Sequence, residues 1–230
     1  MAIVRTAWLP IAVTGVVAGL AYLLCGIICS LPPIIIAMTL VYLFRDPDRS
    51  IPPVPLGVVS PVDGRVVAVG AVSDPFLGRD AVKMVIRMQA LGPWILRSAM
   101  EGRVMQQWYL PGGLEPQLVA GMDKETLDRE APARQAHFAM WVQSDELDDV
   151  VIVIRGIFIP QRLRCSVQVG ERIGQGQRCG LLLIGATADV YLPANCRIDV
   201  IQDGTVRAGS DIIATLIHKE APAAPPVTGQ

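Results

Sequence analysis

Residues able to move protons or to attack a substrate are few in this chain of 230 residues. The only histidines are His137 and His218, and the five cysteines include no Cys-x-x-Cys pair. A zinc site built from such ligands is therefore not expected, and we expect no other metal site. Two isolated histidines also give no basis for assembling a serine or cysteine triad. The sequence thus gives no indication of the commonest hydrolytic or zinc-dependent chemistries.

Charge, glycine spacing and cysteine usage limit the partners and the compartment. Lys and Arg number 20 against 21 Asp and Glu, so no basic excess indicates a nucleic-acid partner. The pattern Gly174-x-Gly176-x-x-x-Gly180 does not match the dinucleotide fingerprint and is expected to form a β-turn between two strands. Five scattered thiols are more typical of a reducing compartment than of a disulfide framework.

The first 44 residues have the composition of a membrane anchor. No charged residue occurs from Thr6 to Phe44. The run Ile11–Ile28 is about as long as a membrane-spanning helix, which needs roughly 20 residues. The segment Ser30–Pro33 is expected to break this run, and the second apolar run, Ile34–Phe44, is too short to cross a membrane alone without tilt. We assign residues 1–44 to the anchor, 45–218 to one folded domain and 219–230 to a disordered, Ala/Pro-rich tail.

Two arrangements of the anchor remain open: a helical hairpin with both ends on one face of the membrane, and a single span with an extension at the interface. Arg5 precedes the apolar region, and Arg45 and Arg49 follow it. Positive charge on both flanks favours the hairpin with both ends in the cytoplasm. A cleaved signal peptide fits less well, because the apolar region is too long and no small-x-small site precedes a polar start. The expected location is the bacterial inner membrane, with the folded domain in the cytoplasm.

The rest of the chain predicts a mostly β domain with few short helices. Short runs rich in Val and Ile are separated by glycine turns, which is typical of antiparallel sheets packed as a sandwich or barrel. The best helix candidate is Asp123–His137, although Pro132 interrupts it. The predicted strands are Arg65–Val69, Val82–Met88, Val150–Ile154, Arg162–Val169, Gly180–Ile184, Asp189–Leu192 and Arg197–Ile201.

Four segments of the chain are distinctive in combination. They are Phe44-Arg45-Asp46-Pro47-x-Arg49-x-x-Pro52; Ser60-Pro61-Val62-Asp63-Gly64-Arg65-Val66; Gly156-Ile157-x-x-x-x-Arg162-Leu163 with Gly170-x-Arg172-Ile173-x-x-Gly176-Gln177-Arg178-x-Gly180; and Gly185-x-x-x-Asp189-Val190-Tyr191-Leu192-Pro193. In this order and at this spacing, behind an apolar N-terminus, they resemble the short bacterial and archaeal form of phosphatidylserine decarboxylase. The resemblance covers roughly residues 35–217.

In the family that the chain resembles, the protein makes its own cofactor. A serine in a Gly-Ser bond attacks the preceding carbonyl, the resulting ester breaks by elimination, and the new N-terminus becomes a pyruvoyl group. This ketone forms a Schiff base with the substrate amine and accepts electrons as the carboxylate leaves. The cleavage requires the serine hydroxyl, a histidine that moves its proton and an aspartate that orients the histidine.

The resemblance places an aspartate but no histidine at the expected positions. Asp63 matches the family aspartate, although an Asp-Gly pair can also simply form a turn. The family histidine belongs in residues 89–97, where Arg97 and Gly102 hold the register and Trp94 occupies the place of the histidine. An indole nitrogen only donates a hydrogen bond and cannot accept a proton.

Other residues of the chain do not supply the missing imidazole. His137 and His218 lie in segments that do not match the family histidine, so each is expected to be a surface or packing residue. Arg97, which holds the register of the family segment, is a candidate substrate-binding residue.

The self-cleavage bond of the family corresponds to Gly185-Ala186 in this chain. Alanine has no oxygen with which to attack and cannot be eliminated to a pyruvoyl group. Thr187 is adjacent, but a shift of one residue along a strand turns the side chain to the other face. Gly209-Ser210 is a true Gly-Ser pair, but it lies in what the family uses as a final turn. Neither is expected to replace the serine.

The two missing groups are those that move the proton and form the cofactor. The resemblance therefore implies a membrane-bound, unprocessed relative of phosphatidylserine decarboxylase with no pyruvoyl cofactor and no decarboxylase activity. Its partner would be the phospholipid membrane, where it binds an aminophospholipid head group, associates with itself, or pairs with and regulates an active relative. Two alternatives are an active decarboxylase that forms phosphatidylethanolamine through an altered cofactor site, and a structural membrane adaptor.

Overall fold

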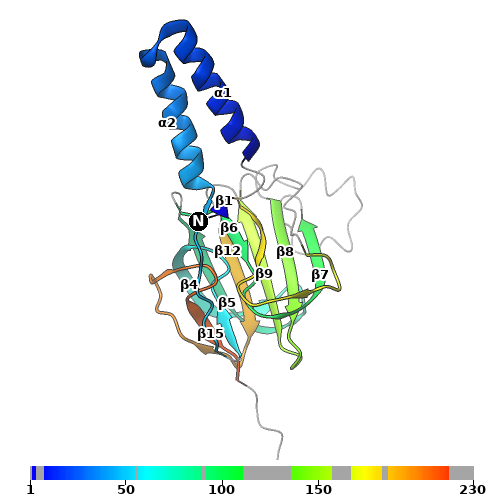
Figure 1. Cartoon of the computed structure of the whole chain (residues 1–230). Helices are drawn as coiled ribbons and strands as arrows, with labels where there is room; N and C mark the ends of the chain where they lie inside the picture. The colour runs from blue at the N-terminus through cyan, green and yellow to red at the C-terminus, as the bar shows by residue number, and fades with distance from the viewer. Residues whose placement is uncertain are drawn as a thin grey trace, which may run out of the picture.

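A helical hairpin projects from a β domain in this chain (Figure 1). The structure is a computed structural model that describes residues 2–3, 8–54, 56–89, 92–110, 136–156, 167–182 and 186–217. The fold is mostly antiparallel β, as the sequence predicted, and the described residues contain two helices, both in the N-terminal part.

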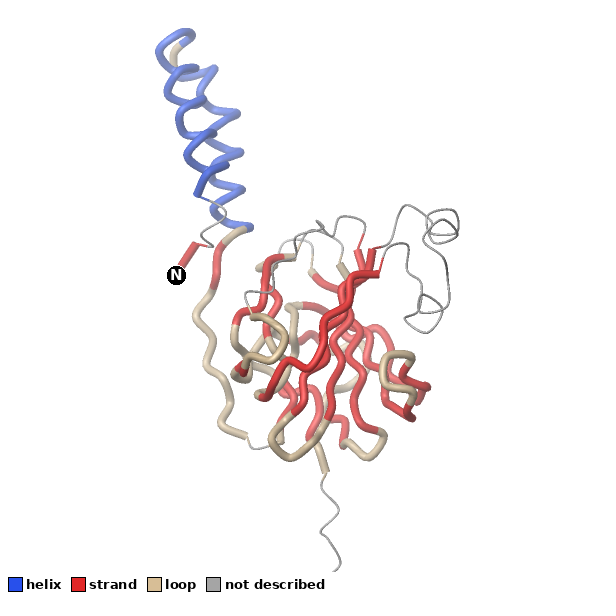
Figure 2. The backbone as a smooth tube through the Cα atoms, turned by 90° about the vertical axis from the view of Figure 1, so that its right-hand side faces the viewer, coloured by secondary structure: helices blue, strands red, loops and turns tan. Residues whose placement is uncertain are grey.

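The hairpin consists of α1 (Trp8–Cys25) and α2 (Ile27–Leu43), which lie side by side and run in opposite directions (Figures 1 and 2). The chain reverses at Gly26, whose φ of 76° lies in the left-handed region that glycine adopts without steric cost. The expectation that Ser30–Pro33 breaks the apolar run was wrong, because these residues continue α2. Glycine conformation, and not the proline pair, therefore sets the position of the turn.

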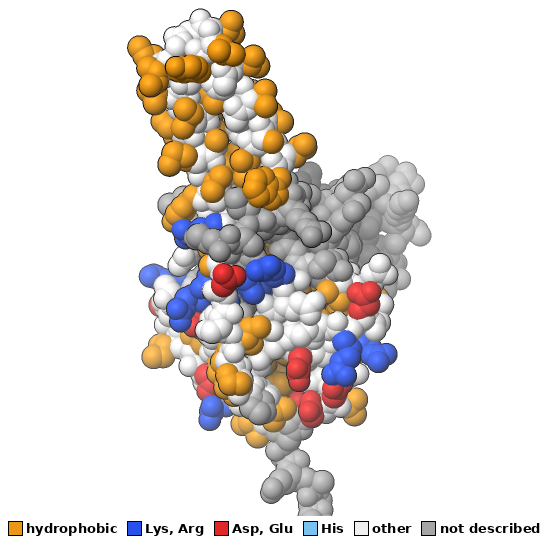
Figure 3. All heavy atoms as spheres, in the orientation of Figure 1, with side chains coloured by type: hydrophobic (Ala, Val, Ile, Leu, Met, Phe, Trp, Pro, Cys, Tyr) orange, Lys and Arg blue, Asp and Glu red, His pale blue; other side chains and the backbone are white. Residues whose placement is uncertain are grey.

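The surface of the hairpin is almost entirely apolar. No residue of α1 is buried, and its mean hydropathy is 1.9. Figure 3 shows hydrophobic side chains along the visible face of the hairpin, while charged side chains appear from the base of the hairpin downward. By length and composition, α1 is the one described helix that is able to cross a membrane; the neighbouring apolar helix is shorter.

Both ends of the hairpin meet at its base. The short strand β1 (Ala2–Ile3) pairs antiparallel with β2 (Arg45–Asp46), directly after α2. Beyond β2 the chain runs along the side of the β domain before it enters the first core strand (Figure 2). The hairpin is therefore closed by backbone hydrogen bonds at the end nearest the domain.

An eight-stranded antiparallel sheet forms most of the β domain, with two small sheets packed beside it. The strand order of the large sheet is β10-β7-β8-β9-β12-β5-β4-β14, and the small sheets are β11-β6 and β13-β15-β3. The strands are β3 (Gly57–Val59), β4 (Gly64–Asp74), β5 (Arg79–Met88), β6 (Ile95–Arg97), β7 (Gly102–Leu110), β8 (Ala136–Gln143), β9 (Asp149–Gly156), β10 (Arg172–Ile173), β11 (Arg178–Leu181), β12 (Thr187–Pro193), β13 (Arg197–Ile198), β14 (Thr205–Val206) and β15 (Ile212–Thr215).

Side chains of the large sheet alternate between two apolar clusters, because successive residues of a strand point to opposite faces. In β9, Ile152 and Ile154 enter the main core, whereas Val151 and Val153 enter a smaller cluster on the other face. Phe76, in the turn between β4 and β5, lies over this smaller cluster and contacts the rings of Trp108 and Tyr191. Both faces of the central strands are thus covered.

Most predicted strands fall within observed ones. The predictions within β4, β5, β9 and β12 are confirmed. The prediction Gly180–Ile184 overlaps only the end of β11, and the prediction Arg197–Ile201 covers β13 but extends beyond its end. Val167–Val169 lies in a bend and turn, so the predicted end of the strand Arg162–Val169 was wrong, and residues 162–166 lie outside the described residues.

The helix predicted over Asp123–His137 was wrong at its end. Ala136 and His137 begin β8, and residues 123–135 lie outside the described residues. Phe138 and Met140 alternate into the main core, and this period of two, typical of a strand, determines the structure of the segment. The proposed tail, residues 219–230, also lies outside the described residues.

Candidate functional site

The carboxylate of Asp63 is buried at the turn that leads into β4. Its Oδ2 atom accepts a hydrogen bond from Arg49 Nη2 at 2.7 Å, and its Oδ1 atom accepts one from the backbone N–H of Ala208 at 2.6 Å. The turn is held by the Ser60 hydroxyl, which donates to the Val62 carbonyl at 2.7 Å. Because both carboxylate oxygens accept hydrogen bonds, the side chain of Asp63 is fixed in position.

Asp63 and Ala186 meet at the end of β5. The N–H of Gln89 donates to the Asp63 carbonyl at 3.1 Å, and the N–H of Met88 donates to the Ala186 carbonyl at 3.1 Å. Gly64 pairs with Met88 in the sheet, and a Cβ on Gly64 would lie 2.4 Å from the Arg87 carbonyl oxygen. Only glycine allows β4 and β5 to approach so closely here, and this approach places the two positions on either side of one strand.

Ala186 lies in the main core with 3% of its surface exposed, directly before β12. Gly185, the other half of the bond, lies outside the described residues. Ala188 of β12 faces the same core, whereas Asp189 lies on the other face with Lys83 and Arg155. By this alternation the side chain of Thr187 lies on the face opposite Ala186.

Trp94 is a core residue, 4% exposed. Its ring packs edge-on against Phe44 at the end of α2, with 5.7 Å between ring centroids and 75° between planes. Its carbonyl accepts a hydrogen bond from the N–H of Leu182 at 2.7 Å, and Leu182 and Ala186 belong to the same apolar cluster as Trp94. Trp94 and Ala186 therefore belong to one apolar cluster, and Trp94 joins that cluster to the hairpin.

Arg97 is buried and directed at backbone carbonyls. Nη1 donates to Gly176 O at 3.0 Å, and Nη2 reaches Pro47 O at 3.4 Å. Gly209, with φ of +70°, lies against the aliphatic part of the side chain, so that a Cβ there would lie 2.9 Å from Arg97 Cδ. These contacts give Arg97 a structural part in joining β6 to the segment after the hairpin.

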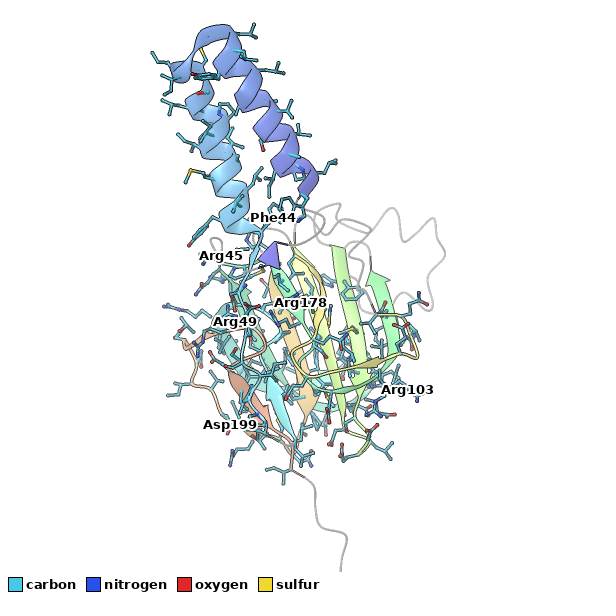
Figure 4. The ribbon with its side chains drawn as sticks, viewed as in Figure 1. Phe44, Arg45, Arg49, Arg103, Arg178 and Asp199 are labelled. Atoms are coloured by element: carbon cyan, nitrogen blue, oxygen red, sulfur yellow. The ribbon has the colours of Figure 1, made fainter. Side chains whose placement is uncertain are left out.

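Residues 44–49, which we name the strap, contact three residues of this site: Trp94, Arg97 and Asp63. Phe44 packs on Trp94, Pro47 accepts from Arg97, and Arg49 pairs with Asp63. Figure 4 shows Phe44, Arg45 and Arg49 following one another down from the base of the hairpin onto the β domain. The sequence analysis did not predict these contacts, although Arg49 and Asp63 both belong to the distinctive segments.

The cavity between the strap and the site is small. It has a volume of about 10 Å³, room for about one water molecule. Its lining residues are Pro47, Arg49, Asp63, Pro93, Ile95, Arg97 and Ala208. Within the described part of the chain, Pro47 and Arg49 of the strap therefore help to line the small space beside Asp63.

Comparison with known proteins identifies the family of this chain. The sequence model of the phosphatidylserine decarboxylase family matches residues 36–214. A phosphatidylserine decarboxylase proenzyme of Nitrosomonas eutropha is 35% identical over 212 residues, which cover 92% of this chain and 94% of the relative. The proenzymes of Nitrosomonas europaea and Aromatoleum aromaticum are each 34% identical over the same shares. The chain belongs to the phosphatidylserine decarboxylase family. No solved structure gave a significant match.

Phosphatidylserine decarboxylases use a pyruvoyl group produced by self-processing, and the site can be tested for its fit to that group. By its position in the sequence, Ala186 is predicted to occupy the place of the serine, and the methyl group of Ala186 belongs to the main core. The neighbouring hydroxyl of Thr187 belongs to the other face of the sheet. Ser210 lies in a turn in which its N–H donates to Arg207 O at 3.2 Å. The described residues therefore do not fit a pyruvoyl precursor at position 186.

His137 lies on the face of the sheet opposite Ala186. It pairs in register with Arg155, which in turn pairs with Thr187. Its Nε2 atom is buried and has no hydrogen-bond partner in the structure. His218 lies outside the described residues. His137 is thus a half-buried packing residue, away from the family site.

The folded protein is expected to become less stable as the pH decreases below about 6.5, because the pKa of His137 is lower in the folded than in the unfolded chain. Burial lowers the pKa of His137, and the positive charges of Arg155 and Lys83 lower it further, while Asp189 opposes them. The unfolded chain then takes up a proton at a pH at which the folded chain does not, so acid favours unfolding. His137→Gln should flatten the pH dependence of the urea midpoint between about pH 7 and 5. An unchanged dependence would show that His137 is readily protonated in the fold.

Proposed function

We propose that this phosphatidylserine decarboxylase family member is a membrane-bound, unprocessed protein without decarboxylase activity. The observation that carries the proposal is Ala186, because a methyl group provides neither the attacking oxygen nor the leaving group from which a pyruvoyl group forms. Processing at this bond is a covalent reaction of that one side chain, so no rearrangement of neighbours compensates for its absence.

The surroundings of Ala186 support the same conclusion. Trp94, in the place of the family histidine, packs into the core against Phe44. Its indole nitrogen is a hydrogen-bond donor only and cannot accept a proton. Asp63 retains the family carboxylate but pairs with Arg49. The cleavage needs a serine, a histidine and an aspartate. Only the aspartate remains, and its role is to orient the histidine.

We further propose that the hairpin enters the membrane and returns, with the β domain on the cytoplasmic side of a bacterial inner membrane. The apolar surface of α1 and α2 and the pairing of β1 with β2 at the base support this arrangement. Arg45 lies directly after the hairpin, where positive charge favours the cytoplasmic side. Its guanidinium stacks on the ring of Tyr42, 4.0 Å from the centroid.

Two roles at the membrane follow from an inactive scaffold: binding of an aminophospholipid head group, and association with an active relative. At the position of Asp63 itself a head group does not fit, because the cavity there has about 10 Å³ and small-molecule sites occupy about 300–1,000 Å³. We therefore propose the second role for this site. In this role the protein pairs with an active decarboxylase and alters its processing or activity. Co-expression with the Nitrosomonas eutropha relative, followed by affinity purification in mild detergent, should recover both chains.

A decarboxylation assay tests the proposed loss of activity. Membranes containing the protein should release no labelled carbon dioxide from carboxyl-labelled phosphatidylserine above membranes without it. The Nitrosomonas eutropha relative, expressed in the same host, serves as the positive control. Release that is abolished by borohydride, which reduces a Schiff base, would contradict the proposal and support an active enzyme with an altered cofactor site.

A further inference from the structure

Two cysteines flank the turn at the tip of the hairpin. Cys25 is the last residue of α1, Gly26 makes the turn, and Cys29 lies in the first turn of α2. Both thiols are free and exposed, and they lie four residues apart on either side of the Gly26 turn. The reversal at Gly26 therefore places two oxidisable groups at the point of the hairpin farthest from the β domain (Figure 1).

The tip lies about one membrane thickness from the β domain. The 18 residues of α1 extend about 27 Å at 1.5 Å per residue, close to the roughly 30 Å of a bilayer core. If the hairpin is inserted as proposed above, its base lies at the surface beside the β domain and its tip reaches the opposite surface. For a cytoplasmic β domain, that surface faces the oxidising side of the inner membrane.

We propose that Cys25 and Cys29 are an oxidisable dithiol that closes to an intrachain disulfide at the far surface of the membrane, an inference that rests on the membrane placement above. The oxidant is a disulfide donor of that compartment. The thiolate of one cysteine attacks a sulfur of the donor and forms a mixed disulfide, and the second cysteine then displaces the donor sulfur. Two protein thiols become one disulfide, and the donor disulfide becomes two thiols.

The bond ties the last turn of α1 to the first turn of α2 across Gly26. It restricts the turn in which the left-handed glycine is the flexible element, and so it fixes the hairpin in its closed form. The other described cysteines differ in their surroundings: Cys179 is buried in the β domain, and Cys196 is half-buried there. These two thiols should remain reduced, and they serve as internal standards.

Oxidation of the purified full chain in detergent tests the geometry without any membrane. Treatment with oxidised glutathione should remove two hydrogens from the peptide Thr6–Arg45, which trypsin releases with both cysteines because no Lys or Arg lies between Arg5 and Arg45. The matched control is Cys29→Ser combined with Ser30→Cys, which moves the thiol by one residue to a buried position. The control should form glutathione adducts but no internal bond. If Cys25 and Cys29 of the unaltered chain form no disulfide under these conditions, the proposal is overturned.

Alkylation in cells tests whether the bond forms in place. Cells are quenched with a membrane-permeant maleimide, and the peptide Thr6–Arg45 is weighed before and after reduction. We expect that fewer than about one molecule in ten carries two maleimides before reduction, because an oxidising compartment maintains the bond. Two maleimides on most molecules would overturn the dithiol proposal. A membrane-impermeant maleimide applied to cells with the Cys29→Ser variant separately tests whether Cys25 at the tip is reached from outside. This second measurement distinguishes a wrong membrane placement from a dithiol that does not oxidise.

Discussion

Restoring the two missing groups together, by Ala186→Ser with Trp94→His, is expected to give partial self-cleavage at best. The serine would supply the attacking oxygen, and the imidazole would supply the base that the indole cannot. The Asp63 carboxylate is buried and fixed, and the backbones of Asp63 and Ala186 lie beside the same end of β5. The measurement is a denaturing gel with mass determination, in which cleaved molecules give two fragments divided before residue 186.

Cleavage should stay incomplete because Trp94 is a core residue in this chain. Truncation of a buried Trp to Ala costs about 3–5 kcal/mol, and an imidazole refills only part of the space. The apolar neighbours, including Phe44, also disfavour a charged imidazole. Cleavage as complete as in an active relative would contradict this account and show that the pocket still fits a histidine.

The control for the restored protein is a third substitution, Asp63→Asn. Removal of the orienting carboxylate from a serine-protease triad lowers the rate about 10⁴-fold, and a similar loss is expected here. Ala186→Ser alone, without an imidazole, should remain uncut over the same time. Cleavage that is independent of Asp63 would show that another group moves the proton.

Removal of the Asp189 carboxylate is expected to cause a large loss of stability of the β domain. Asp189 is 1% exposed in the central strand β12. It accepts from Arg155 Nη2 at 2.5 Å and pairs with Lys83 Nζ at 2.9 Å. Asp189→Ala leaves two neighbouring cations without a counter-charge, and removal of one partner of a buried pair costs about 3–5 kcal/mol. We expect a loss of stability at the lower end of this range, because Lys83 and Arg155 are partly exposed.

Urea unfolding of the full chain in detergent, followed by tryptophan fluorescence, measures this loss. The matched control replaces the whole cluster, with Asp189→Leu, Lys83→Met and Arg155→Met, because an apolar replacement of buried ions is often neutral. The control should recover most of the stability that Asp189→Ala loses. Equal losses in both variants would show that packing at β12, and not the unpaired charges, determines the effect.

The central strands were predictable from the sequence because they are buried on both faces. Val150–Ile154 is an unbroken apolar run, and it lies in β9 with side chains in both apolar clusters. The strand β7 was not predicted, since Gln106 and Gln107 interrupt its apolar pattern on a less buried part of the sheet. The start of β8 was missed because a charged segment beside it favoured a helix.

Local preferences misplaced the turn of the hairpin. A proline pair was expected to end a helix, yet Pro32 and Pro33 lie inside α2. The turn instead occurs at Gly26, where a left-handed backbone has no steric cost. Composition predicted the apolar character of the anchor correctly. Whether the turn forms at Gly26 or at Pro32-Pro33 depends on how the two helices pack, and composition gives no information about that packing.

The motifs indicated Asp63 and Ala186 as parts of one site, and the structure places both beside the end of β5. The contacts of the strap could not be predicted in the same way. Arg49 reaches Asp63 only because the chain between them folds back along the β domain, a path that no local pattern encodes. Trp94 was identified as a substitution, but its packing on Phe44 required the three-dimensional arrangement.

The intact mass of the protein purified from membranes tests the central claim most directly. An unprocessed chain should give one species near 24.7 kDa, with a free or formylated N-terminus and no second fragment. A chain cut before residue 186, with the new N-terminus blocked as a keto acid, would contradict the account and make the protein a self-processing enzyme despite its alanine.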